Sequence, residues 1–420
     1  MISADAQARA GVPSGKRRSL LGRLVWALTG VGVLGFLIQA LGSVGASNGA
    51  SSGAVTNGPV GSSQRVKPDI PIIDFHVHLS ASAVPRLEAL MARYGIERIV
   101  NLSGGDPLTN LDAELAAAAS APGKIIVFTT LAYAQATQPD YGIRMARLLQ
   151  LAHDRGARGL KIAKVLGLGL RRADGTLIPV DDPALDPVFD LAGQLGMPIT
   201  IHTGDPEAFW LPVDAQNPRR AELEAHPGWA LYGKEVPSFD QLLHQLETRI
   251  ARHPGTTFIS VHFGNAAERP AWVASLLRKY PNLYIDTAAR IPELGRHPAA
   301  ALRAFFVEFQ DRILYGSDLG VGPEPTPLFL GSQGPRPPTA AEQELFFSAS
   351  RRYFETADVN FPHPTPIQGD WKISGIALPR QILQKVYHDN AARLLGLDSR
   401  FPESSGSDTR KRAAEPEIRH

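Results

Sequence analysis

Short apolar runs rich in β-branched residues alternate with amphipathic runs between residues 66 and 397. Brief apolar runs bounded by glycine or polar positions are typical of buried strands, and an apolar position every three or four residues indicates a helix. Strands are expected at residues 70–79, 98–102, 124–131, 159–165, 198–203, 257–263, 282–286 and 312–315. Helices are expected at residues 84–94, 111–119, 141–155, 184–195, 239–252, 271–280, 298–309 and 380–395.

This alternation predicts an α/β fold with a parallel sheet that helices cover on both sides. Eight strand–helix units favour a closed (β/α)8 TIM barrel, in which active sites lie at the carboxyl ends of the strands. An open doubly wound sheet is the alternative, but it would more often carry a glycine-rich loop after its first strand. Long connections at 204–237 and 320–378 follow strands 5 and 8, and we expect them to form walls around the active-site mouth.

The two ends of the chain have a different composition from its middle. A basic segment, an apolar stretch at 24–44 and a Gly/Ser-rich linker follow one another within residues 1–65. This order is typical of a signal peptide, and the apolar stretch is also long enough for a transmembrane helix. We therefore expect a protein that is exported to the periplasm or the extracellular space, or anchored in a membrane. Residues 66–397 are expected to form the barrel and residues 398–420 a disordered tail.

Composition narrows the chemistry that the chain can perform. The 43 basic and 41 acidic residues give a net charge of +2, which argues against a nucleic-acid partner. The absence of cysteine excludes disulfides, iron–sulfur clusters, zinc ribbons and a thiol nucleophile. A metal ion would therefore need His, Asp, Glu or a modified Lys as ligands. The expected partners are a small-molecule substrate and a membrane contacted through the N-terminal segment alone; self-association into a homo-oligomer stays open.

Histidines and one aspartate fall at the ends of the predicted strands. His76 and His78 end strand 1, His202 ends strand 5, His262 ends strand 6, and Asp318 follows strand 8. Residues i and i+2 of a strand share a face, so His76 and His78 can both face the barrel axis, with the residues between and before them turned to the helices. Three or four imidazoles and a carboxylate around one mouth suit a divalent transition metal, with zinc preferred.

The order HxH, Lys, His, His, Asp along a predicted barrel resembles the amidohydrolase superfamily. The surrounding motifs are similar to its amidohydrolase-2 (amidohydrolase-related) branch over about residues 68–397: IDFHVH at 73–78, IHT at 201–203, VHFG at 261–264, YGSD at 315–318 and NAARLL at 390–395. The resemblance implies that His76, His78, His202 and Asp318 bind the metal, and that His262 is a further ligand or polarises substrate or water. Lys161 would either be carbamylated and bridge two ions or bind an acidic substrate, and the branch favours one ion.

These residues predict a metal-dependent hydrolase that cleaves an amide, ester or lactone bond. Bound zinc lowers the pKa of its water toward about 7, and Asp318 would take the proton and pass it to the leaving group. Arg290 would hold a substrate carboxylate, or pair with Asp205 or Glu293. The alternatives are a metal-dependent non-oxidative decarboxylase or hydratase, that is a lyase, on the same barrel, and a catalytically inactive membrane-tethered binding module.

Overall fold

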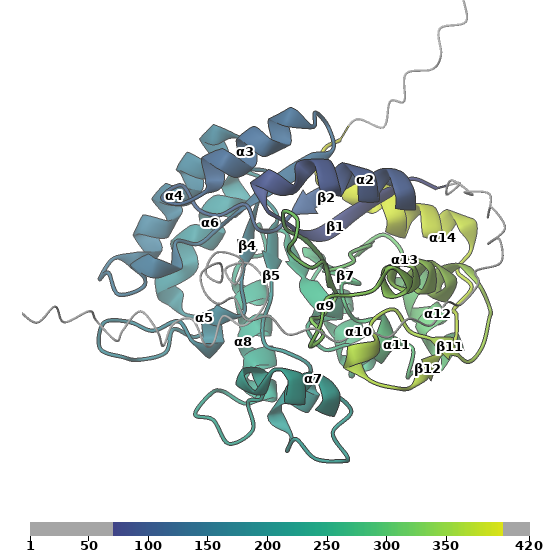
Figure 1. Cartoon of the computed structure of the whole chain (residues 1–420). Helices are drawn as coiled ribbons and strands as arrows, with labels where there is room; N and C mark the ends of the chain where they lie inside the picture. The colour runs from purple at the N-terminus through teal and green to yellow at the C-terminus, as the bar shows by residue number, and fades with distance from the viewer. Residues whose placement is uncertain (1–69, 398–420) are drawn as a thin grey trace, which may run out of the picture.

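A barrel of parallel strands surrounded by helices forms the centre of the computed structural model, which describes residues 70–397 (Figure 1). The strands β1 to β8 pair in parallel, each with the next in the chain. Their bounds are Ile72–Leu79, Ile96–Asn101, Ile125–Thr130, Gly159–Ile162, Ile199–Ile201, Phe258–Ser260, Leu283–Asp286 and Ile313–Leu314. The predicted α/β TIM barrel is therefore confirmed.

The predictions for residues 1–65 and 398–420 lie outside the described residues and remain predictions. Within the part of the chain that the structure describes, no helix is both long enough and apolar enough to span a bilayer.

Seven of the longer helices follow the predicted order. They are α2 (Val84–Tyr94), α3 (Leu111–Ser120), α4 (Tyr141–Arg155), α6 (Asp186–Gln194), α8 (Phe239–Arg252), α10 (Pro270–Lys279) and α12 (Ala299–Glu308). The helix α13 (Ala340–Glu355), in the last long loop, was not predicted. The predicted helix 380–395 is α14 (Arg380–Gln384), a π-helical turn η7 (Lys385–Asp389) and α15 (Asn390–Leu394). The wider turn leaves the Val386 carbonyl to accept a hydrogen bond from Tyr315 N–H at 2.9 Å.

The barrel closes where the chain leaves β8 and runs along β1. Phe75 N–H donates to the Tyr315 carbonyl, and Asp318 N–H donates to the His76 carbonyl, each at 2.9 Å. Beyond this point β9 (Leu319–Val321) pairs in parallel with β1, and β10 (Phe329–Leu330) pairs antiparallel with β9. The sequence pattern did not predict these two short strands.

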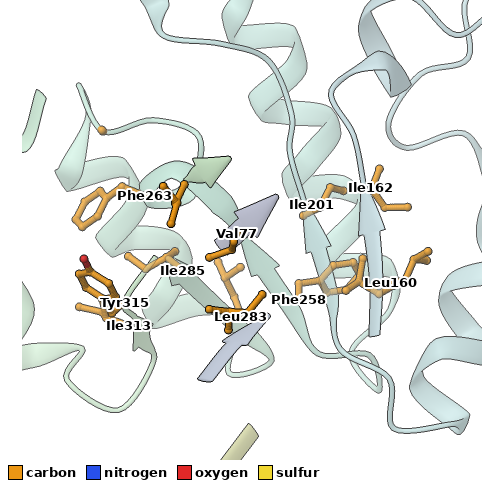
Figure 2. Close-up of a cluster of buried hydrophobic side chains, with 14 of the residues drawn as sticks. Val77, Leu160, Ile162, Ile201, Phe258, Phe263, Leu283, Ile285, Ile313 and Tyr315 are labelled. Atoms are coloured by element: carbon orange, nitrogen blue, oxygen red, sulfur yellow. The ribbon is translucent and has the colours of Figure 1, made fainter. Parts of the chain in front are cut away.

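An apolar shell lies between the strands and the helices, and Figure 2 shows some of its residues on the strands and directly after them. Leu160 and Ile162 of β4 belong to it, as the alternation predicts. A second cluster groups Ile73, Phe75 and Phe128 with residues of α15. Phe75 packs edge-on against Phe128 at 5.8 Å in this second cluster, so it is separated from Val77, which belongs to the shell, although the two were expected on the same side. The register of β1 shifts between Asp74 and Val77, and this irregularity breaks the strict alternation of faces.

Both long connections lie at the carboxyl ends of their strands, as predicted. The connection after β5 contains α7 (Arg220–Ala225) and protrudes below the barrel in Figure 1. The connection after β8 contains β9, β10, α13 and a small hairpin of β11 (Phe361–Pro362) and β12 (Lys372–Ile373). Short 3-10 turns at 81–83, 133–135, 183–185, 207–210, 227–229 and 366–368 complete the chain, together with α5 (Val165–Leu168), α9 (Val261–Gly264) and α11 (Ile291–Leu294).

Strands 4 and 6 are shorter than predicted. Strand β4 ends at Ile162 and β6 at Ser260. His262 and Phe263 then have positive φ values of 55° and 56°, in a left-handed turn rather than in a strand. A tertiary hydrogen bond accounts for the change, because the side chain of Asp286 accepts one from His262 N–H at 2.7 Å.

Glu114 joins α3 to the strand ends near the mouth, and its burial generates a pH-dependent prediction. Its carboxylate accepts hydrogen bonds from Ala81 N–H and Asn101 Nδ2, each at 3.1 Å. Burial raises the pKa of Glu114 to about 7, although these hydrogen bonds oppose the shift. The folded state thus binds the proton of Glu114 more tightly than the unfolded chain does. The stability that Glu114 contributes is therefore fully present below the unfolded pKa of about 4.5 and is lost as pH rises through 7.

Glu114→Gln cannot ionise, so we expect the variant to lack this loss. Urea denaturation measures the free energy of unfolding of both proteins at pH 5 and at pH 8. The difference, variant minus unmodified protein, should be more positive at pH 8 than at pH 5. An equal difference between the two proteins at both pH values would contradict the prediction.

Candidate metal and active site

Three of the predicted site residues, His76, His78 and Asp318, form one close group of donor atoms at the carboxyl end of the barrel, and His202 lies beside His262 at the same end. His76 and His78 lie in β1, His202 directly follows β5, and Asp318 follows β8. The rings of His76 and His78 lie 5.3 Å apart on the inner side of the barrel. His76 is fully buried and His78 is partly buried. The i, i+2 argument for these two histidines therefore holds in the structure.

Asp318 faces both histidines. Its Oδ1 atom lies 3.4 Å from Nε2 of His76 and 3.4 Å from Nε2 of His78. These separations are too long for well-formed hydrogen bonds. The backbone of Asp318 has a φ of 66°. Its carbonyl accepts a hydrogen bond from Gly331 N–H, and its own N–H donates to the His76 carbonyl. Gly316 permits this approach, because a Cβ atom there would lie 2.9 Å from Cβ of His76.

His262 reaches the same space from its left-handed turn. Its ring lies 4.3 Å from that of His202 and 4.9 Å from that of His76. The Nδ1 atom of His262 lies 2.9 Å from the Ala288 carbonyl, which can only accept, so Nδ1 carries the proton. The Nε2 atom of the neutral ring therefore offers a lone pair.

Asp286, at the end of β7, is the central residue that the sequence analysis missed. Its Oδ2 lies 2.7 Å from His76 Nδ1, and its Oδ1 accepts hydrogen bonds from His262 N–H and, at 3.1 Å, Ala288 N–H. It therefore sets the ring of His76 with Nε2 toward Asp318 and holds the turn that carries His262. Its position at the end of a predicted barrel strand was the signal that could have identified it.

His78 has an equivalent support from β2 and the residues after it. Its Nδ1 lies 2.7 Å from Ser103 Oγ. Asn101 Oδ1 accepts hydrogen bonds from Ser103 N–H at 2.9 Å and Leu79 N–H at 3.0 Å, so one side chain fixes the backbone on both sides of this contact. Such outer contacts orient imidazoles for metal binding.

Lys161 projects into the barrel from β4, as the strand alternation predicts. It is 4% exposed, and its Nζ atom has no hydrogen-bond partner among the described residues. Burial lowers the pKa of Lys161 to about 8, against the opposing charges of Asp286 and Asp318. His76 Nε2, His202 Nε2 and Asp318 Oδ1 are likewise buried without a hydrogen-bond partner in the described part of the chain. Four buried polar atoms without hydrogen-bond partners in one mouth destabilise the fold unless an ion or another ligand binds them.

The donor set fits a divalent metal ion. For bond lengths of about 2.0–2.2 Å, two ligands of a tetrahedral zinc ion lie roughly 3.4 Å apart. Asp318 Oδ1 has this separation from both Nε2 atoms of the β1 histidines. His76, His262 and Asp286 form another group of closely spaced donors. In that group, however, Asp286 already contacts the Nδ1 atom of His76. His76 is therefore better described as the candidate ligand, and Asp286 as the residue that orients its ring.

The electrostatics of the site suit metal binding. Burial lowers the pKa values of His76 and His202 well below the ordinary value, which keeps both imidazoles neutral and able to ligate. Burial alone would raise the pKa of Asp318, but the adjacent imidazoles of His78 and His76 outweigh it and hold the pKa below its ordinary value. Burial thus keeps His76 and His202 neutral, while Asp318 is ionised.

Arg290 lies beside this group, directly after β7. It is 7% exposed, and its Nη1 donates a hydrogen bond to the Ala289 carbonyl at 3.1 Å. Of the two carboxylates that were alternatives to a substrate, Asp205 pairs with Lys164 at 2.7 Å and Glu293 pairs with Arg219. Neither alternative pairing with Arg290 is present among the described residues.

The aromatic side chains of the long loops mostly pack the loops onto the barrel. Trp371 donates from Nε1 to the Pro292 carbonyl at 2.8 Å, and Trp210 donates to the Pro237 carbonyl at 3.0 Å. The ring of Trp229 lies 5.9 Å from Nζ of Lys164. His363 contacts the Gly369 carbonyl at 3.0 Å within its own loop, which is a structural role.

Solved structures similar to this chain are distant in sequence. A putative amidohydrolase from Staphylococcus aureus has 16% identity and a TM-score of 0.47, over 78% of this chain and 100% of its own. A 2,6-dihydroxybenzoate decarboxylase from Rhizobium has 17% identity and a TM-score of 0.44, over 78% and 99%. A probable 2-pyrone-4,6-dicarboxylic acid hydrolase from Acinetobacter baumannii has 15% identity and a TM-score of 0.42, over 78% and 100%. Similarities this distant support no inference about the chemistry of this chain.

A comparison with curated proteins found no match. The model of the amidohydrolase family, in contrast, matches residues 73–397. This range spans all eight barrel strands except the first residue of β1, and it includes each candidate site residue from His76 to Asp318. The chain therefore belongs to the amidohydrolase family of metal-dependent enzymes.

Proposed function

We propose that this protein is a metal-dependent hydrolase that cleaves an amide, ester or lactone bond of a small molecule with a metal-activated water. The observation that carries the proposal is the set of buried polar atoms without hydrogen-bond partners in the barrel mouth, namely His76 Nε2, His202 Nε2, Asp318 Oδ1 and Lys161 Nζ. Two imidazoles and a carboxylate are ligands that zinc prefers, and a buried ammonium suits an anion.

In this proposal His76, His78, His202 and Asp318 hold one ion, with zinc preferred. A bound divalent ion supplies a Lewis acid that makes water nucleophilic near neutral pH. One ion is favoured because, within residues 70–397, Asp318 is the one carboxylate that faces both β1 histidines at ligand spacing, while Asp286 contacts His76. The neutral imidazoles and the supports from Asp286 and Ser103 fit this role.

Asp318 and His262 are the proposed proton-handling residues. Asp318 stays ionised near neutral pH, so it can accept a proton from the attacking water and return it to the leaving group. His262 donates from Nδ1 to Ala288, so its Nε2 atom is an acceptor. It can therefore ligate the ion or orient the water by accepting its hydrogen bond, but its neutral form cannot donate to a substrate carbonyl.

Arg290 and Lys161 are the proposed substrate-binding cations. Both are buried in the mouth, and neither forms an ion pair with a carboxylate in residues 70–397. Uncompensated buried cations favour an anionic group in the substrate, and a guanidinium matches a carboxylate in a bidentate geometry. A substrate bearing a carboxylate next to the scissile bond fits this arrangement.

The proposal predicts about one equivalent of transition metal in protein purified without chelator, with turnover lost on metal removal and restored by zinc. Elemental analysis and an assay panel of lactones, esters and amides measure both. Release of carbon dioxide without bond hydrolysis would instead identify the lyase alternative. Metal without turnover on the panel would favour the inactive binding module, and less than about a tenth of an equivalent would contradict the metal site.

Asp318→Asn should reduce turnover by roughly 10²–10⁴-fold, because the amide cannot accept the proton as a carboxylate does. Thermal unfolding should show that the variant stays folded. His244→Asn is the matched control, since His244 is exposed on α8, and it should keep both metal and turnover. Normal turnover in Asp318→Asn would remove Asp318 from the mechanism.

Lys161→Ala separates the two proposed roles of this lysine. If Lys161 binds substrate, metal content should stay at one equivalent, and KM for a carboxylate substrate should rise by about tenfold or more. The exposed Lys279→Ala is the control and should change neither value. Two equivalents in the unmodified protein, falling to one in Lys161→Ala, would show that a carbamylated lysine bridges two ions.

A further inference from the structure

A buried cluster of charges joins the two long loops to α11 next to the site mouth. Arg219 and Glu222 come from the loop after β5, Glu293 from α11 after β7, and Ser332 from the loop after β8. The exposed fractions of Arg219, Glu222 and Glu293 are 1%, 3% and 3%. Burying a charge this deeply has a high desolvation cost, so leaving any one of these charges without a partner would be strongly destabilising.

Arg219 is held between two carboxylates. Its Nη1 donates to Glu222 Oε2 at 2.6 Å, and its Nη2 donates to Glu293 Oε1. The hydroxyl of Ser332 donates to the other oxygen of Glu222. Glu293 Oε2 has no hydrogen-bond partner among the described residues. Glu293 therefore has one oxygen bound to Arg219 and one oxygen free to accept.

Arg290 stands three residues before Glu293, at the start of α11. Residues at this spacing are neighbours on a helical turn, and buried opposite charges that are neighbours ordinarily pair. Burial raises the pKa of Glu268, and the charges of Glu293 and Arg290 act on it in opposite senses, so both lie near the same carboxyl group. Yet Arg290 and Glu293 form no ion pair in the structure of residues 70–397.

We infer that Arg219 is a specificity-positioning residue: by holding Glu293, it keeps Arg290 free of a carboxylate partner from the protein and so makes the mouth select anionic substrates. This inference rests on the proposed role of Arg290 as the cation that binds a substrate carboxylate. Without Arg219, the carboxylate of Glu293 would be buried and unpaired. Arg290 is the neighbouring cation with free donors, so Glu293 would take it as its partner.

The inference makes the effect of removing Arg219 depend on the charge of Glu293. The probes are benzoate and benzamide, which have the same shape and differ in charge. Calorimetric titration of the full-length, metal-loaded protein gives the ratio of their dissociation constants, which measures the preference for the anion. Arg219→Met should reduce this preference by about tenfold or more, because Glu293 then neutralises Arg290. Arg219→Met combined with Glu293→Gln should restore it, because the competing carboxylate is gone.

Glu222→Gln is the matched control. It removes the other carboxylate of Arg219 at the same depth but leaves the contact with Glu293, so the preference for benzoate should persist. If Arg219→Met does not fold, Arg219→Lys replaces it. Its single ammonium cannot hold both carboxylates in the same fork, so a smaller loss is expected, again reversed by Glu293→Gln.

Three outcomes overturn the inference. A preference unchanged in Arg219→Met, a loss that Glu293→Gln fails to reverse, or an equal loss in Glu222→Gln would each show that Arg219 does not act through Glu293. Arg290→Gln distinguishes this failure from failure of the proposed function. If Arg290→Gln keeps the preference for benzoate, Arg290 is not the anion-binding residue, and both its assignment and this inference fall, whereas the metal-dependent reaction stands on its separate test.

Discussion

The hydrogen bond from Asp318 N–H to the carbonyl of His76 is the contact on which the site depends. It closes the barrel between the exit of β8 and β1, and the same contact places the carboxylate of Asp318 opposite the two histidines of β1. Asp318 adopts a left-handed backbone to make it, and Gly316 leaves the space for the approach. Closure of the sheet and assembly of the donor set are therefore one structural event, in which residues more than 240 positions apart come into contact.

Burial then determines the chemistry of the assembled groups. Histidines withdrawn from water lose the charged form, whereas Asp318 keeps its charge because imidazoles face it. Asp286 and Ser103 occupy the Nδ1 atoms of His76 and His78, so both Nε2 atoms are turned toward the same carboxylate. The barrel thus presents buried lone pairs and an ionised carboxylate to one space, and the outer contacts orient them as metal ligands are oriented.

The loops after β5 and β8 complete the mouth and connect its charges. Their aromatic residues fasten them to the barrel, so they act as fixed walls. Where they meet α11, Arg219 and Glu293 form a buried ion pair, and Arg290 forms no ion pair with a carboxylate in residues 70–397.

The sequence alone determined the barrel, its order of elements, the two long loops and the strand ends of β1, β5 and β8 at which histidines and an aspartate lie. These features follow from local regularities: alternation of faces in a strand, the helical repeat, and the common edge at which parallel strands end. Lys161 was placed correctly by the same argument. Phe75 and Val77 were expected on the same side but lie in different apolar clusters, and the register shift between them arises in the pairing of β1 with β2.

Tertiary structure decided the features that depend on a partner distant in the chain. The left-handed turn at His262 exists because Asp286, on another strand, binds its amide, and no local pattern encodes that contact. The pairing of Arg290 was equally undetermined, since Asp205 and Glu293 were both plausible partners in sequence and each is taken by another cation in the fold. A sequence specifies which side chains can be charged. Which of them pair depends on their burial and their separation, and both are set only when the barrel has closed.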